Sequence, residues 1–345
     1  MRAPAIGIAI YAVPRCRPGE GIMFFQRGFG GYVFGALAAL AMLLAASTSR
    51  ADTAVSACGT LPTRGNYFLT KNLTASGTCI VIGDEGVSFD MRGHTITGNG
   101  TGDGISDGGG EFESMAIANG KIRNFSVGIG LDNSCCVVIR NVDSSKNTAT
   151  GILVGECCGT IDSVTADNNG TAGIVANDCC YTLNNVQANN NGGGGGVFAG
   201  GNGCCTTLSN STVSGNGGAG VFMEGCCSFL VSSTVKGSGA DGVDMNDCCN
   251  FVINSTVAGS AGKGISLIED DNLVVGSTVF SNGGDGIFLT NDTNQITNTS
   301  STGNGGFGAN VECPGAITGL TTKNNTSGPL NTTGGTCTQL NNKLL

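Results

Sequence analysis

The residues CCSFLVSSTVKGSGADGVDMND at positions 226–247 are followed directly by CCNFVINSTVAGSAGKGISLIE at positions 248–269. The two stretches are equal in length, and each starts with two adjacent cysteines. Such doublets occur six times, and the steps from each to the next are 22, 22, 25, 22 and 22: Cys135-Cys136, Cys157-Cys158, Cys179-Cys180, Cys204-Cys205, Cys226-Cys227 and Cys248-Cys249. Two more steps of 22 reach Asp270-Asp271 and Asp292-Thr293. A fixed period of this length is typical of stacked-repeat proteins, in which no unit can bury its apolar face alone.

Within the repeat, apolar and glycine positions recur in fixed columns. The fifth residue of each unit is aliphatic: Ile139, Ile161, Leu183, Leu208, Leu230, Val252, Val274 and Ile296. The seventeenth is glycine: Gly151, Gly173, Gly195, Gly220, Gly242, Gly264, Gly286 and Gly308. Two aliphatic positions one residue apart follow that glycine, as in Ile152 with Val154. This alternation predicts short strands with one buried face, and the glycine column predicts a positive φ or a close backbone approach.

A polar column runs beside these strands. It reads Asn147, Asn169, Asn191, Asn216, Ser238, Ser260, Asn282 and Asn304. Asparagine side chains stacked at identical turns can hydrogen-bond from one coil to the next. Short strands, tight turns, an aliphatic interior and a polar ladder together predict that each repeat is one coil of a parallel β-helix. The one longer repeat should carry its surplus as a loop within the run from Gly192 to Gly203.

Composition limits the classes of partner. Sixty glycines without a strict triplet exclude collagen, and the net charge of −9 argues against nucleic acid, which needs clustered Lys and Arg. The acidic balance also disfavours unaided binding of polyanions such as pectate, although bridging Ca²⁺ would reverse that argument. We therefore expect no cofactor, with Ca²⁺ as the one candidate that the composition leaves open.

Residues 1–51 predict a leader and signal peptide rather than part of the fold. From Met23, a candidate true start, the chain has a basic residue at Arg27, an apolar run from Tyr32 to Ala46 and a small-residue site ending at Ala51. The apolar run is too short for a stable membrane span. We expect cleavage after Ala51 and a secreted or periplasmic protein of bacterial type.

An oxidising compartment predicts disulfides for the sixteen cysteines that follow the leader. Cys58 with Cys79 and Cys313 with Cys337 should close the two ends. The twelve doublet cysteines admit three arrangements: coil-to-coil bonds, since coils lie about 4.8 Å apart; a vicinal ring within each doublet; or a ladder of thiolates for Zn²⁺ or Cu(I). We favour vicinal rings narrowly, because they need no even number of coils, and we predict no metal.

A resemblance to a known superfamily supports the fold. The residues VSFDMRGHTITG at positions 87–98, followed by Gly102-Asp103-Gly104-Ile105, resemble the first coil of right-handed parallel β-helix proteins of the pectin-lyase-like superfamily. The resemblance covers roughly residues 58–312. It implies a right-handed fold. With the repeats and the outer cysteine pairs, we predict an all-β, right-handed parallel β-helix of about ten coils, with an N-terminal cap and first coil over 52–97, the helix over 98–312 and a C-terminal cap over 313–345. The resemblance also implies a long glycan as the leading class of ligand.

The sequence does not name a reaction, so whether the protein is an enzyme is left undecided. Asp270-Asp271 resembles the paired aspartates of polygalacturonases, but the accompanying Gly-His-Gly and Arg-x-Lys elements are missing, and the chain's single histidine is His94. We interpret both features as structural. The acidic residues before the doublets, Glu156, Asp178, Asp247 and Glu269, form a broken column that is typical of turns.

One exposed row is a candidate ligand surface. The residues between the two buried aliphatic columns are Leu153, Val175, Val197 and Phe222. Apolar side chains gathered on one exposed face indicate a partner or polymer, and the alternative is that they lie beneath the N-terminal cap or the segment after Cys313. The sequence thus favours a secreted, non-catalytic carbohydrate-associated or surface-interaction scaffold stabilised by its cysteine doublets. The alternative is a polysaccharide lyase, glycoside hydrolase or uronate epimerase acting on a long glycan.

Overall fold

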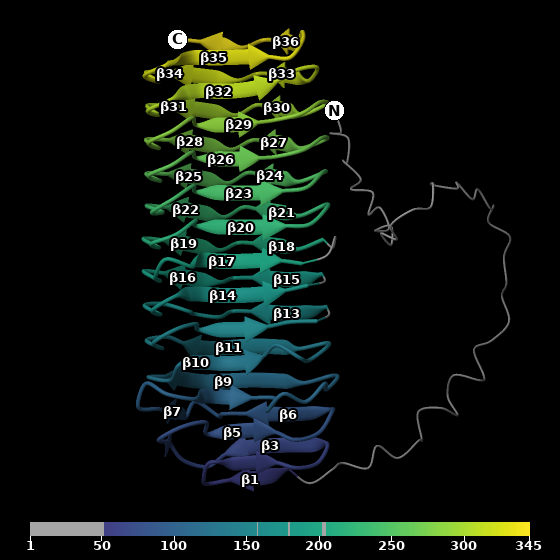
Figure 1. Ribbon diagram of the computed structural model, residues 1–345, viewed down its shortest axis with the longest axis vertical. Helices are drawn as coiled ribbons and strands as arrows, with labels where there is room; N and C mark the ends of the chain where they lie inside the picture. Colours follow the sequence, from purple (N-terminus) through teal and green to yellow (C-terminus); the bar gives the residue numbers. More distant parts are fainter. Residues whose placement is uncertain (1–51, 157, 179, 202–204) are drawn as a thin grey trace, which may run out of the picture. The chain divides into compact units, whose positions relative to one another are not determined.

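The computed structural model describes residues 52–156, 158–178, 180–201 and 205–345. The predicted leader and the doublet cysteines Cys157, Cys179 and Cys204 lie outside these residues. The described chain contains strands, turns and bends but no helix, and it winds into a stack of coils in which every strand pair is parallel. Figure 1 shows the coils following one another in chain order along the long axis of the stack.

Three sheets run along the stack. Sheet 1 has 13 strands: β2 (Gly59–Leu61), β5 (Ile80–Ile82), β8 (Asp103–Ser106), β10 (Val127–Leu131), β12 (Ile152–Val154), β14 (Ala172–Asn177), β17 (Gly195–Gly200), β20 (Val221–Glu224), β23 (Val243–Asn246), β26 (Ile265–Leu267), β29 (Ile287–Leu289), β32 (Phe307–Glu312) and β35 (Gly328–Thr333). It is the sheet that carries the candidate surface.

Sheet 2 has 16 strands: β1 (Thr53–Val55), β3 (Gly65–Leu69), β4 (Leu73–Thr74), β6 (Val87–Asp90), β7 (Thr95–Thr97), β9 (Ala116–Arg123), β11 (Val138–Ser144), β13 (Gly159–Asp162), β15 (Tyr181–Asn184), β18 (Thr207–Ser209), β21 (Phe229–Val231), β24 (Phe251–Ile253), β27 (Leu273–Val275), β30 (Gln295–Thr297), β33 (Ala316–Thr318) and β36 (Thr338–Leu340). Sheet 3 has eight: β16 (Gln187–Asn189), β19 (Thr212–Ser214), β22 (Thr234–Lys236), β25 (Thr256–Ala258), β28 (Thr278–Phe280), β31 (Ser300–Thr302), β34 (Thr321–Lys323) and β37 (Lys343–Leu344).

One coil shows how the sequence produces this order. After β23 in sheet 1, the doublet Cys248-Cys249 forms a turn into β24 of sheet 2. Asn254 bends the chain with a φ of 49°, and β25 of sheet 3 follows. Like residues then stack on like residues, because the period of the chain matches one circuit of the coil.

The interior holds the predicted aliphatic columns. Ile152 and Val154, and their equivalents on later coils such as Val243 and Met245, are fully buried. The predicted asparagine ladder is also present: Asn147 Nδ2 donates to Asn169 Oδ1 at 3.1 Å, and Asn169 repeats the bond to Asn191 at 3.1 Å. These side chains are buried, so the ladder satisfies polar groups that the core would otherwise leave unpaired.

The glycine column is explained by close approach rather than by positive φ. A Cβ added to Gly173 would lie 2.6 Å from the carbonyl oxygen of Gly196, one coil further along. The backbones therefore meet at a point where no side chain fits. Gly196, not Gly195, occupies this column in the longer coil, and Gly195 has a φ of 89°.

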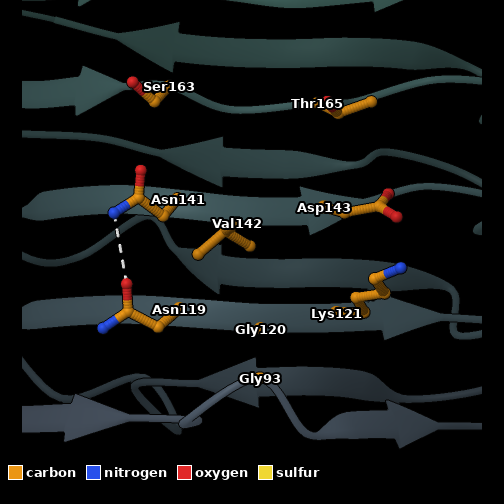
Figure 2. A pocket seen from close by; sticks show the side chains of 9 residues that line it. All are labelled: Gly93, Asn119, Gly120, Lys121, Asn141, Val142, Asp143, Ser163 and Thr165. Atoms are coloured by element: carbon orange, nitrogen blue, oxygen red, sulfur yellow. Dashed lines mark hydrogen bonds between the residues drawn. The ribbon is translucent and has the colours of Figure 1, made fainter.

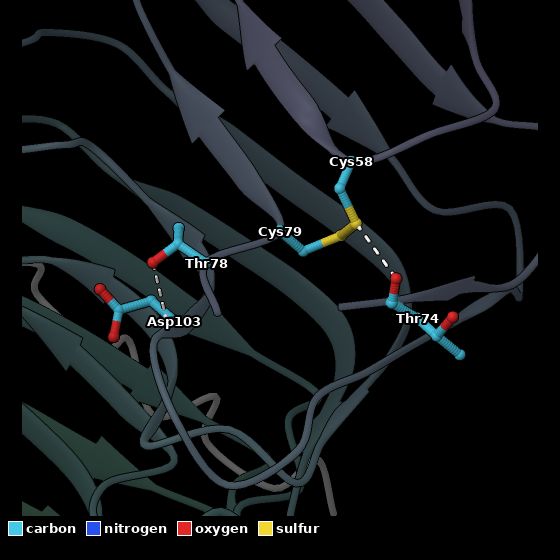
Figure 3. The surroundings of a disulfide bond; sticks show 5 residues. All are labelled: Cys58, Thr74, Thr78, Cys79 and Asp103. Atoms are coloured by element: carbon cyan, nitrogen blue, oxygen red, sulfur yellow. Dashed lines mark hydrogen bonds between the residues drawn. A yellow bond between two sulfur atoms is a disulfide. The ribbon is translucent and has the colours of Figure 1, made fainter. Parts of the chain in front are cut away.

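Both segments predicted as caps are built from strands of the same sheets. Residues 52–97 contribute β1 to β7, and residues 313–345 contribute β33 to β37. Sheet 1 accordingly has one strand on each of thirteen coils, against the ten coils predicted. The two end disulfides are present, Cys58 with Cys79 and Cys313 with Cys337. Figure 3 shows the first of them, where Cys58 Sγ lies 3.6 Å from the carbonyl oxygen of Thr74.

Candidate functional site

A row of outward side chains runs along sheet 1, one from each coil. The strand register places Leu153 beside Val175, Val175 beside Phe198, and Phe198 beside Phe222. The row continues through Asp244, Ser266 and Phe288. We call these seven residues the sheet 1 strip. Except for the buried Ser266, they are partly exposed, so the strip offers solvent a line of contact sites parallel to the stack.

The prediction of Val197 in this row is wrong, and Phe198 takes its place. Val197 is 1% exposed and pairs with the inward residues Ile174 and Val221. One of the three surplus residues of the long coil lies between Asn191 and Gly195, the first residue of β17, and shifts the strand by one position. Since side chains alternate along a strand, a one-residue shift exchanges the buried and exposed faces.

Two aromatic contacts give the strip its shape. The rings of Phe198 and Phe222 stack with centroids 4.9 Å apart and planes 13° from parallel. Further along, Lys263 Nζ lies 3.8 Å from the ring centroid of Phe288, a cation–π contact that holds the ammonium group over the ring. The strip therefore has an apolar part, from Leu153 to Phe222, and a charged part in which Lys263 lies over the ring of Phe288.

Carboxylates surround that charged part. Asp241 Oδ1 accepts a hydrogen bond from Lys263 N at 2.7 Å, and Asp285 Oδ1 accepts one from Phe307 N at 2.7 Å. Burial raises the pKa of Asp244, the negative charge of Asp241 raises it further, and Lys263 opposes both. Three carboxyl groups with one lysine make this end of the strip acidic, like the chain as a whole.

A shallow cleft lies on a different face, at the bend where β9, β11 and β13 pass from sheet 2 toward sheet 3. Its volume is about 340 Å³, and Figure 2 shows Asn119 and Asn141 along one side with Lys121, Asp143 and Thr165 along the other. Asn141 Nδ2 donates to Asn119 Oδ1 at 3.2 Å. Asp143 forms an ion pair with Arg123 at 3.3 Å. Much of the polar rim is thus engaged in bonds between coils.

At the three doublets whose two cysteines are both described, the vicinal rings that the sequence favoured are absent. Cys136, Cys226, Cys248 and Cys249 are free thiols, which excludes a ring at their three doublets in this structure. Cys158 and Cys180 are free as well. Stacking of equivalent residues instead brings Cys226 Sγ within 3.3 Å of Cys248 Sγ on the next coil. Oxidation of the twelve doublet cysteines stays a prediction.

The other predicted positions lie in structural settings. His94 Nδ1 is 3.3 Å from Asn72 Oδ1 on the neighbouring coil. Asp270 lies in the doublet column, where its Oδ1 accepts a bond from Asp292 N at 2.9 Å. The broken acidic column of Glu156, Asp178, Asp247 and Glu269 has left-handed backbone throughout, which is the conformation of a turn.

No group of three or more His, Cys, Asp or Glu side chains in the described ranges is arranged to hold a metal ion. Within the same residues, no helix is long and apolar enough to cross a membrane.

A second polar ladder, adjoining the doublets, was missed by the sequence interpretation. Asn250 N donates to Asn272 Oδ1 at 2.8 Å, and Asn272 N donates to Asn294 Oδ1 at 2.8 Å. Each side-chain amide also reaches back to its own turn, as from Asn250 Nδ2 to the carbonyl oxygen of Asp247 at 2.6 Å. The recurrence of these asparagines at the repeat period was the signal that could have found the ladder.

Comparisons with known proteins agree on the architecture. Residues 195–344 match the family model described as a right handed beta helix region. No curated protein matches the sequence. The periplasmic alginate epimerase AlgG is similar in structure, with a TM-score of 0.62 and 14% identity over 79% of this chain and 78% of that one. The A-module of the Azotobacter vinelandii mannuronan C-5 epimerase AlgE4 has a TM-score of 0.52 and 13% identity, over 82% and 89%.

Identities this low establish shared fold rather than shared chemistry. The repeat period, the parallel sheets and the family match nevertheless agree with the resemblance found at residues 87–98. The chain is a right-handed parallel β-helix protein with the pectin-lyase-like fold.

Proposed function

We propose that this protein is exported and binds a long, neutral polysaccharide along the sheet 1 strip, without turning it over. The observation that carries the proposal is the continuous row from Leu153 to Phe222. Its four apolar side chains occupy successive coils along one line, a shape suited to an extended polymer rather than to a compact ligand. The apolar C–H faces of pyranose rings are surfaces that such a row can contact.

Electrostatics favours a neutral glycan. A polyuronate lying along the strip would meet Asp241, Asp244 and Asp285, with Lys263 as the cation among them. Like charges brought together in a partly desolvated contact repel one another. A neutral polymer avoids this repulsion. The disulfides at both ends of the stack support export, because such bonds persist in oxidising compartments.

The test measures affinity with two matched double variants. Isothermal titration against neutral glucans and mannans, and against alginate and pectate with and without Ca²⁺, should show binding to a neutral polymer. Phe198→Ala with Phe222→Ala should weaken that binding at least about tenfold, as loss of two aromatic contacts predicts. Phe229→Ala with Phe251→Ala removes a similar stacked pair, with centroids 4.7 Å apart, from sheet 2 and should leave affinity unchanged. Equal losses in both variants, or binding restricted to uronates, would contradict the proposal.

A second candidate function has one specific observation in its favour. Asp244, whose pKa is raised by burial, lies one coil from Lys263 on the same face. A carboxyl group of raised pKa beside a cation is an arrangement found at sites of acid–base catalysis. Assays for new reducing ends and for unsaturated uronates would show turnover if the protein is such an enzyme. Turnover that disappears in Asp244→Asn would replace the non-catalytic proposal.

A further inference from the structure

The cysteine doublets form a feature that glycan binding does not use. In the described part of the column, Cys226 and Cys248 occupy equivalent positions on consecutive coils, each three positions before the paired Phe229 and Phe251. The Cys248 thiol donates to Cys226 Sγ at a sulfur–sulfur distance of 3.3 Å. The backbone agrees with this register, because Cys227 N donates to the carbonyl oxygen of Cys248 at 3.1 Å.

Elsewhere in the stack the same geometry already carries disulfides. Cys58 and Cys79 immediately precede the paired residues Gly59 and Ile80, and their Cα atoms are 4.6 Å apart. Cys313 and Cys337 join the last coils with a Cα separation of 5.1 Å. Both bonds run from one coil to the next. The spacing of coils in a parallel sheet therefore falls in the range that a disulfide requires.

The first doublet supplies an independent observation. Cys135 is disulfide-bonded, whereas its neighbour Cys136 is a free thiol. The bond at this doublet is consequently not a vicinal ring. At this doublet the first cysteine is the member that bonds away from its own turn, and Cys226 and Cys248 are both first members of their doublets.

We propose that Cys226 and Cys248 form a disulfide by exchange with a small-molecule disulfide. The bond joins two neighbouring coils at the turn that leads from sheet 1 to sheet 2. One cysteine thiolate attacks a sulfur of the reagent R–S–S–R, forms a mixed disulfide and expels RS⁻. The second cysteine thiolate then attacks the protein sulfur of that mixed disulfide, forms the Cys226–Cys248 bond and expels the second RS⁻. The two cysteine protons end on the two expelled thiolates, so two thiols and one disulfide give one disulfide and two RSH.

The surroundings predict that this reaction is slow at neutral pH. Burial raises the pKa of Cys226 to about 11. It also raises the pKa of Cys248. Since the thiolate is the attacking species, exchange should accelerate as pH rises toward these values. A fully exposed thiol would exchange readily at neutral pH, so the pH dependence of the rate reports on this partly buried pair.

The experiment maps the bond after treatment of the intact chain with oxidised glutathione at mildly alkaline pH. The protein is then unfolded in acid, remaining thiols are alkylated, and trypsin with a glutamate-specific protease cuts after Glu224, Lys236 and Lys263. These cuts place the two doublets on separate peptides, 225–236 and 237–263. The proposal expects the peptides to be joined until reductant is added, with fragmentation placing the bond at Cys226 and Cys248.

Variants of one doublet provide the matched control. Cys248→Ser should abolish the joined pair, and Cys249→Ser should retain it. Peptides that separate without reductant, whether because each carries its own ring or because Cys226 and Cys248 are alkylated, overturn the proposal. So does a joined pair that persists in Cys248→Ser. If Cys248→Ser does not fold, fragmentation of the wild-type pair decides between the two cysteines.

Discussion

Asn141 adopts a left-handed backbone with a φ of 54°, and the residue at its position does the same on nearly every coil. Most of these residues are asparagine, serine or glycine: Asn119, Ser163, Asn185, Asn210, Ser232, Asn254, Gly276, Asn298, Gly319 and Asn341. Asparagine tolerates this conformation better than most residues because its short side chain can bond locally. The column bends each coil between sheets 2 and 3, and it thereby forms one side of the cleft in Figure 2.

Asp244 allows a prediction at the scale of one side chain. Burial raises its pKa, so the folded chain holds this proton more tightly than the unfolded chain does. Ionisation of Asp244 therefore lowers the free energy of unfolding. This loss is absent below the ordinary pKa of 3.8 and is complete once the pH exceeds the raised pKa of the folded chain. Asp244→Asn should therefore raise the free energy of unfolding near neutral pH and lose this advantage below pH 3.8.

Urea denaturation at the two pH values measures this difference. Asp292→Asn serves as the control, because Asp292 is exposed on the doublet column and its replacement should change stability little. A lower unfolding free energy for Asp244→Asn near neutral pH would show that attraction between Asp244 and Lys263 outweighs the effect of burial.

Among the elements, the sequence predicted what the repeat period controls. The inward columns at Ile152 and Val154 and the ladder starting at Asn147 follow from identical residues at identical turns. The outward position was predicted correctly for Leu153, Val175 and Phe222 but missed at residue 198, and the use of the row as a ligand surface stays a prediction. The repeat period cannot show where in the long coil the surplus residues lie. A run of glycines has no alternation of apolar and polar side chains, so it does not reveal which residues of the following strand face inward.

The doublets reveal another limit of sequence reasoning. The sequence left coil-to-coil bonds open but favoured a ring within each doublet, because such rings need no even number of coils. The structure places Cys226 against Cys248, and that distance depends on the register of sheet 2 at Phe229 and Phe251. Such a contact joins residues of different repeats, so only the stacked coils determine it.

The first asparagine ladder has a gap that can be filled. Ser238 and Ser260 interrupt it, and their buried hydroxyl oxygens have no hydrogen-bond partner. Asparagine at both positions should extend the bonds that link Asn282 to Asn304 at 3.0 Å. Two asparagines between Asn216 and Asn282 complete three side-chain links. At about 1 kcal/mol for each link, Ser238→Asn with Ser260→Asn should raise the unfolding free energy by roughly 3 kcal/mol.

The reverse substitution provides a control in the same column. Asn169→Ser creates a gap between Asn147 and Asn191 and should lower the unfolding free energy by at least about 1 kcal/mol. Chemical denaturation of both variants and of the wild type gives the comparison. A loss of stability in the double asparagine variant would show that the serine coils lack room for the larger amide.

At the scale of the whole molecule, stability is distributed along the stack. Each coil contacts chiefly the coils before and after it, so stability should be close to a sum over coils and their interfaces. Among the described coils, the first and the last each pair with one other coil. The disulfides at Cys58–Cys79 and Cys313–Cys337 lie at these two ends, where they oppose fraying of the terminal strands.

This organisation predicts that a whole coil can be removed but half a coil cannot. Deleting the full repeat Asn250–Asp271 joins Cys249 to Asn272. Because Asn272 is the equivalent of Asn250 on the next coil, every inward column stays in phase. The shortened protein should keep its β-sheet circular-dichroism spectrum and unfold cooperatively, a few degrees below the wild type. Deleting only the half repeat Asn250–Ser260 puts turn residues where β24 should pair with β21, so polar and glycine residues replace the buried side chain of Val252. That variant should lose cooperative unfolding and aggregate through its exposed strand edges.

If both deletions are tolerated equally, coil phase does not determine the fold. If both abolish folding, the stack behaves as one indivisible unit rather than as a sum of coils.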